Sequence, residues 1–252
     1  MTVADYIALF CVLALVAVIL QQMRFRRKLR TLAAQITTLR RLEGQEVRYR
    51  PIGPNEPWLV DVKTTVDEAT NLFQEMGLTV LGDLIEEDEA ENASGVTRWF
   101  VDRERTTCGW VAAVPSQQGI QLVAFLFSET GSHRFVVTHM GPTSIRLATP
   151  PFVSHAHYPS HGGLAAVLTA HQEALSSSCN PTVLRNTVDL PAAVTLVGRL
   201  RKATADWRAS QPPDELLIQD LRSVLQGRFD ELGSSVLRLL TRESSTTTSY
   251  AA

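Results

Sequence analysis

The chain has 252 residues, is 44% hydrophobic and carries a formal charge of −2, a composition typical of a globular protein that buries a core. The charge is unevenly distributed: residues 21–50 hold nine Lys or Arg against two Glu, a net +7, whereas residues 51–252 hold 15 Lys or Arg against 23 Asp or Glu, a net −8. Because most of the chain is acidic, it is a poor match for nucleic-acid phosphates, and we expect no nucleic-acid partner.

An apolar run, YIALFCVLALVAVIL, occupies residues 6–20. It is shorter than the roughly 20 residues that a helix needs to cross the hydrocarbon core, but the flanking residues can extend it. Basic side chains follow at once and can reach lipid headgroups: Arg24, Arg26, Arg27, Lys28 and Arg30. The pattern predicts a single transmembrane helix within residues 1–22 and anionic lipid headgroups as its partners.

The order of charges around this run predicts its orientation. A secretory signal peptide carries basic residues before the apolar stretch, whereas here Asp5 precedes it and the basic residues follow. A signal peptide and a buried core helix are the alternatives to an anchor. The positive-inside rule places the N-terminus outside and the C-terminal domain in the cytoplasm, at the inner or plasma membrane.

A short heptad pattern follows the apolar run, in residues 23–43. Its apolar positions are spaced 4, 3, 4 and 3 apart: Phe25, Leu29, Leu32, Ile36 and Leu39. The seam lasts barely two heptads, which leaves two interpretations open. It is either a parallel coiled-coil stalk that makes a homodimer, or an amphipathic helix lying on the membrane or on its own domain. Residues 44–57, with two Gly and three Pro, are expected to be a linker.

Residues 58–178 have the pattern of an α+β domain. A capping box, TVDE at 65–68, predicts a helix that stops at Gly77, and a second helix is expected over 163–176. Between them the apolar period is two, and the short connections indicate an antiparallel meander. The candidate strands are 78–86, 96–104, 108–114, 119–128, 134–140 and 145–149.

The C-terminal part is expected to be helical over residues 179–242. Asp189 can cap a helix that runs to about Trp207, and Pro213 begins another with an apolar stripe. This helical hairpin either packs on the sheet or binds a partner. The last ten residues, 243–252, are polar and are expected to be disordered. The predicted fold class is therefore α+β: a transmembrane helix, a helix–antiparallel β-meander–helix domain and a helical hairpin.

A histidine-rich stretch, PPFVSHAHYPSHGG, is the strongest candidate for chemistry. In extended backbone the H-x-H motif places His155 and His157 on the same side, a geometry that suits one metal ion. His161 follows four residues on, and His139 could approach from a neighbouring strand. HAHYPSH contains no carboxylate to act as a general base. We therefore favour a structural segment that leads from the last strand to the helix, with a metal-dependent hydrolase using His155, His157 and His161 as the alternative.

Other chemistries have no sequence support. The three cysteines form no C-x-x-C, so neither a disulfide framework nor a cysteine zinc site is indicated, and a reducing cytosol is compatible. Neither G-x-G-x-x-G nor G-x-x-x-x-G-K occurs, so we expect no nucleotide cofactor and assign no catalytic residue. The most consistent function is a membrane-anchored cytosolic module that binds a protein or a small ligand without catalysis. Its specific partner is not indicated.

Overall fold

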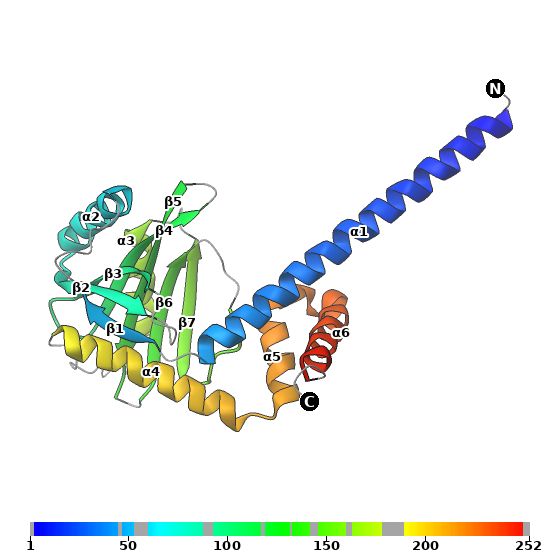
Figure 1. Cartoon of the computed structure of the whole chain (residues 1–252). Coiled ribbons are helices and arrows are strands. Elements are labelled where there is room, and N and C mark those ends of the chain that lie inside the picture. The colour runs from blue at the N-terminus through cyan, green and yellow to red at the C-terminus, as the bar shows by residue number, and fades with distance from the viewer. Residues whose placement is uncertain are drawn as a thin grey trace. The chain divides into compact units, whose positions relative to one another are not determined.

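The structure, a computed structural model, describes residues 3–44, 47–52, 60–87, 93–116, 119–131, 133–141, 146–159, 163–177 and 189–248. In the first helix the side chains of residues 17–40 are described, and in the last helix those of residues 229–240. The chain divides into two compact units (Figure 1). The helical unit comprises residues 1–42, 146–148 and 212–252, and the sheet unit comprises residues 43–145 and 149–211.

The sheet unit is built on seven strands that are neighbours in the sheet in the same order as in the chain. Each pair is antiparallel except the last, which is parallel. This arrangement confirms an α+β fold with a largely antiparallel sheet. The strands are β1 (Arg48–Pro51), β2 (Thr79–Glu87), β3 (Ala93–Val101), β4 (Cys108–Ser116), β5 (Gly119–Glu129), β6 (Phe135–Gly141) and β7 (Val153–Pro159).

The end of the sheet differs from the prediction. Residues 146–150 are irregular, so the strand expected at 145–149 is wrong, and the histidine-rich stretch supplies the edge strand β7 instead. Because β7 runs parallel to β6, the chain has to return along the sheet before it pairs, which a tight turn cannot achieve. Pro150 and Pro151 precede β7 and do not end the sheet. The predicted extended backbone at His155 and His157 is confirmed.

Two predicted boundaries also move. Part of the expected linker, residues 48–51, forms β1, which pairs with β2 and places Arg50 in an ion pair with Glu87. The helix α2 (Val60–Glu75) begins five residues before Thr65, so Thr65 is not its N-cap. The C-terminal end of α2 is as predicted. Gly77, two residues after Glu75, has φ +87°, a conformation that glycine adopts without strain.

Helices cover both faces of the sheet (Figure 1). On one face, α2 and α3 (Leu164–Ser176) bury a core with strand residues that include Phe100, Val111 and Leu126. On the other face, α4 (Leu190–Ser210) packs against strand residues that include Trp99 and Phe127. As predicted, Asp189 caps α4: its side chain accepts the Ala192 N–H at 2.9 Å. One helix of the expected tail therefore belongs to the sheet unit.

The helical unit contains α1 (Val3–Gly44), α5 (Pro213–Leu225), a single 3₁₀ turn η2 (Gln226–Arg228) and α6 (Phe229–Thr248). The helix expected from Pro213 is interrupted at Gln226, where φ is +47°. The heptad seam of α1 packs within the chain, since Leu29 and Ile36 are buried in one cluster with Leu221 and Val236. A homodimer through the same seam stays a prediction, and it would require α5 and α6 to leave these residues.

Within the described part of the chain, no helix combines the length and the apolar character needed to cross a membrane. The predicted anchor, residues 6–20, lies mostly in the stretch of α1 whose side chains are not described. The predicted anchor and the heptad pattern of residues 23–43 lie in one continuous helix, because α1 reaches Gly44.

Candidate functional site

The rings of His139, His155 and His157 lie close together at the β7 edge of the sheet, on the face that α4 partly covers. The register pairs His139 of β6 directly with His157 of β7, and Val137 with His155. Because side chains alternate along a strand, His155 and His157 share one face of β7, the same face on which His139 lies. The ring centroids are 5.0 Å apart for His139 and His157, and 6.1 Å apart for His139 and His155.

The structure thus brings together two of the three predicted metal ligands and adds the neighbour-strand histidine. His161 lies outside the described residues, so the predicted set of His155, His157 and His161 stays a prediction, as does the hydrolase built on it. Among the side chains that are described, no three His, Cys, Asp or Glu are already placed to hold a metal ion.

The histidine rings continue a row of aromatic side chains across the sheet. Successive strands pair Trp99 with Trp110, Trp110 with Phe125, and Phe125 with His139. The Phe125 ring stacks on His139 at 4.4 Å and lies 4.6 Å from Trp110. Trp99 and Trp110 are buried, whereas Phe125, His139, His155 and His157 are half-buried. The row therefore runs from the core to a partly accessible edge.

The surroundings of His139 keep its imidazole neutral. Burial, helped by the nearby His157, lowers the pKa of His139 from 6.5 to about 4. The ring lies against the backbone of Gly141: a Cβ at that position would stand 2.6 Å from His139 Nε2. The same glycine accepts a hydrogen bond at 3.3 Å from His157 Nε2 through its carbonyl oxygen. Gly141 therefore helps to position both imidazoles.

A second histidine site, which sequence reasoning missed, lies inside the sheet unit. His171 of α3 is fully buried, with Ser128 Oγ 3.0 Å from its Nε2 and Thr138 Oγ1 2.9 Å from its Nδ1. A neutral imidazole has one donor and one acceptor nitrogen, so one hydroxyl donates and the other accepts. Ser128 is also within 3.0 Å of the Thr107 hydroxyl. All four side chains are buried, so the serine–histidine pair is part of a hydrogen-bonded network inside the core.

A sequence signal for His171 does exist. It falls on the apolar stripe of its helix, three and four residues beyond Leu168 and Val167, both of which are buried. A polar residue on such a stripe needs hydrogen-bond partners inside the core. The partners themselves lie on strands far away in the sequence, and only the fold reveals them.

Acidification should destabilise the protein through His171. Burial is the main cause that lowers its pKa from 6.5 to about 4. Between these values the unfolded chain binds a proton that the folded chain does not, so stability is complete above pH 6.5 and falls as the pH drops to about 4. The expected loss is about 3 kcal/mol, and His139 adds to it in the same direction. Urea unfolding of the full chain across this pH range measures it.

Two variants separate this effect from general acid sensitivity. His171→Gln should flatten the pH profile between 4 and 6.5, although it also lowers stability at neutral pH because a hydrogen-bonded network is broken. His133→Asn changes a side chain that is 87% exposed and should keep the wild-type profile. A His171→Gln profile as steep as that of the wild type would contradict the assignment.

These features define an α+β protein whose seven-stranded sheet carries a half-buried imidazole and aromatic row at one edge. Comparison of the chain with protein-family models, with curated proteins and with solved structures returns no match.

Proposed function

We propose that the protein is a membrane-tethered module whose N-terminal helix anchors it in a bilayer and whose sheet unit binds a protein or a small ligand without catalysis. The observation that carries the proposal is the surface of α1 between residues 17 and 30. Exposed apolar side chains there are followed along the helix by a block of basic side chains. Peripheral membrane segments bind anionic bilayers through this combination of apolar burial and positive charge.

The apolar part of this surface lies within residues 18–25 of α1. Relative exposures reach 44–62% for five large side chains: Val18, Ile19, Leu20, Met23 and Phe25. Single exposed apolar residues are ordinary, but a contiguous set marks an interface with a partner or a membrane. Val18, Ile19 and Leu20 end the apolar run of 6–20, and Met23 and Phe25 follow it, which favours lipid as the partner.

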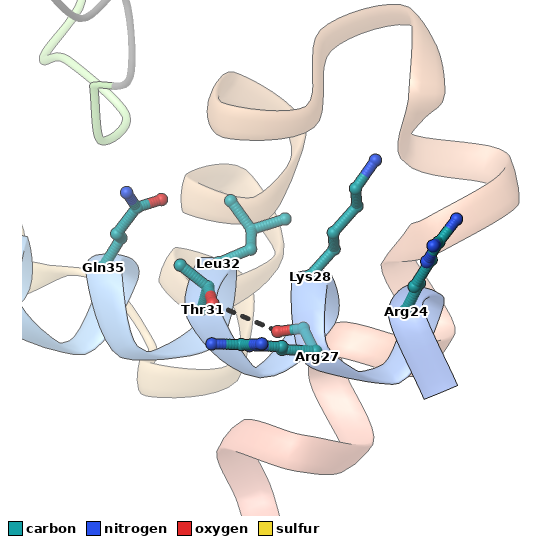
Figure 2. Close-up of a pocket in the computed structure, with 6 residues that line it drawn as sticks. All are labelled: Arg24, Arg27, Lys28, Thr31, Leu32 and Gln35. Carbon is teal, nitrogen blue, oxygen red and sulfur yellow. Dashed lines mark hydrogen bonds between the residues drawn. The ribbon is translucent and has the colours of Figure 1, made fainter. Parts of the chain in front are cut away.

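The basic part lies directly beside it. Arg24, Arg27 and Lys28 line a surface hollow of about 500 Å³ on α1, together with Thr31, Leu32 and Gln35 (Figure 2). Arg24 and Lys28 project to the same side of the helix as Gln35, whereas Arg27 lies along it, and Thr31 Oγ1 donates to the Arg27 carbonyl oxygen at 3.1 Å. Three cationic side chains around one hollow suit the phosphate of a lipid headgroup.

The orientation proposed is N-terminus outside and sheet unit in the cytoplasm. It is supported by the absence of Lys and Arg before residue 24 and by the five basic residues that follow within seven positions. The acidic balance of residues 51–252 keeps the rest of the chain from competing for the anionic lipid surface.

Flotation of the full chain with vesicles tests this proposal. We expect the chain to float with neutral phosphatidylcholine vesicles through its apolar run, and more strongly when phosphatidylserine is added. A basic side chain near an anionic surface contributes about 1 kcal/mol, so replacing Arg24, Arg26, Arg27, Lys28 and Arg30 with Gln should remove at least about tenfold of the preference for anionic vesicles.

A matched control removes five exposed charges from the sheet unit instead: Lys63, Arg103, Arg134, Arg201 and Lys202, each replaced with Gln. This variant should keep the preference of the wild type. The proposal fails if the wild-type chain stays unbound with both kinds of vesicle, or if the two variants lose the preference equally.

A further inference from the structure

The two closest imidazoles have the spacing of ligands on one metal ion. Two imidazoles bound through nitrogen to a tetrahedral Zn²⁺ at about 2.0–2.1 Å have ring centres roughly 5 Å apart. The rings of His139 and His157 are 5.0 Å apart and tilted by 55°. The spacing of these two rings therefore matches that of two imidazoles on one ion.

The third imidazole lies slightly farther away. His155 is 6.1 Å from His139, about 1 Å more than the tetrahedral spacing of roughly 5 Å. It lies on the same face of β7 as His157, two positions before it. His155 has to approach His139 by about 1 Å to complete a three-histidine set, and no such set is formed among the described residues.

The surroundings of His157 orient its ring as metal-binding imidazoles are oriented. His157 Nε2 lies 3.3 Å from the Gly141 carbonyl oxygen, which can only accept, so Nε2 carries the proton and Nδ1 keeps a lone pair. His139 lies between the Phe125 ring and Gly141. Its ring nitrogens have no hydrogen-bond partner among the described residues.

We propose that His139, His155 and His157 form a binding site for a transition-metal ion of the Zn²⁺ or Cu²⁺ class. Neutral imidazoles suit these ions, whereas Ca²⁺ and Mg²⁺ prefer oxygen ligands. The ligand set differs from the one predicted from the sequence, because β7 pairs with β6 and places His139 beside His157. This site is independent of membrane attachment, since its residues lie on the sheet and not on α1.

Metal binding to the full chain, purified in detergent and treated with a chelator, tests the proposal. Co²⁺ is the probe, because its visible absorption reports nitrogen coordination, and Zn²⁺ then competes for the same site. We expect about one ion per chain. His139→Gln, His155→Gln and His157→Gln should each weaken binding at least about tenfold, a change that even outer ligand partners produce.

Three further variants keep the test decisive. His133→Asn changes an exposed histidine on the turn before β6 and should bind as the wild type does. His157→Cys should retain Co²⁺ and add the charge-transfer absorption of a thiolate ligand, which a merely misfolded variant would not show. His161→Gln should leave binding unchanged. Loss of binding in His161→Gln but not in His139→Gln would overturn the ligand assignment, and equal weak binding by all variants would overturn the site.

Discussion

Replacing Trp99 with alanine should lower the free energy of unfolding of the sheet unit by about 3–5 kcal/mol. Trp99 is fully buried at the centre of the face that α4 covers. Its indole meets Tyr49 of β1 edge-on at 5.3 Å, and its Nε1–H donates to Thr97 Oγ1 at 2.9 Å. Truncation removes both contacts, leaves a cavity and loosens the short strand β1, so the cost should lie at the upper end for a core substitution.

Hydrogen exchange of the native full chain measures this effect unit by unit. Slowly exchanging amides of β3, β4 and β5 should lose about 3–5 kcal/mol of protection. This loss equals the expected decrease in the free energy of unfolding, because these amides exchange through unfolding of the whole unit. Leu72→Ala, at a side chain that is 50% exposed, is the control and should change protection by less than about 1 kcal/mol. A loss below about 1 kcal/mol in the Trp99 variant would show that Trp99 is not a core residue.

Asp220→Ala should lower the free energy of unfolding of the helical unit. The carboxylate of Asp220 is fully buried in α5, where it accepts the Ala148 N–H at 2.9 Å and lies 3.4 Å from Arg40 Nε of α1. It thereby ties three separate parts of the chain together. Its removal takes a carboxylate acceptor from the Ala148 N–H and the ion-pair partner from Arg40, whose side chain is 34% exposed and can be hydrated, so the cost should be about 1–3 kcal/mol.

Amide exchange in α5 and α6 measures this second effect. Protection there should fall by about 1–3 kcal/mol, while β3 to β5 of the sheet unit stay unchanged as an internal reference. Asp214→Ala, at an exposed position in the first turn of α5, removes the same charge and should cost less than about 1 kcal/mol. Equal effects of the two substitutions would contradict a structural role for the Asp220–Arg40 pair.

The elements that could be predicted are those with local signals. Asp189, two residues before Pro191, marks the start of α4, and Gly77, after an apolar stripe, marks the end of α2. Both caps involve only neighbouring residues. The strands β2 to β6 follow one another through short connections, so alternation of side chains and turn residues is enough to order them. The heptad seam of α1 correctly indicated a packed face, but not that α5 and α6 would cover it.

The elements that were missed depend on distant contacts. β1 has only four residues in a stretch rich in Gly and Pro, and it exists because β2 offers an edge to pair with. β7 carries no sign of its parallel partner, because strand direction follows from the path of the chain rather than from local residues. The break at Gln226 lies within a continuous apolar stripe, so periodicity alone could not place it.

The candidate site was partly predictable for the same reason. The H-x-H spacing placed His155 and His157 on one face, and this is confirmed because it needs only extended backbone. The contributions of Phe125 and Gly141 come from the register of β5 and β6, which no local pattern encodes. His171 had a local signal, its place on a buried stripe, but its hydroxyl partners lie 33 and 43 residues away.

Alkaline carbonate extraction of membranes from cells that produce the full chain tests membrane anchoring most directly. Carbonate releases proteins held by charge, whereas a helix inserted in the hydrocarbon core stays with the membrane. We predict that the chain remains in the membrane pellet, and that a reporter active only in the cytoplasm is functional when fused to its C-terminus. Complete release of the chain into the soluble fraction would contradict an anchor formed by residues 6–20.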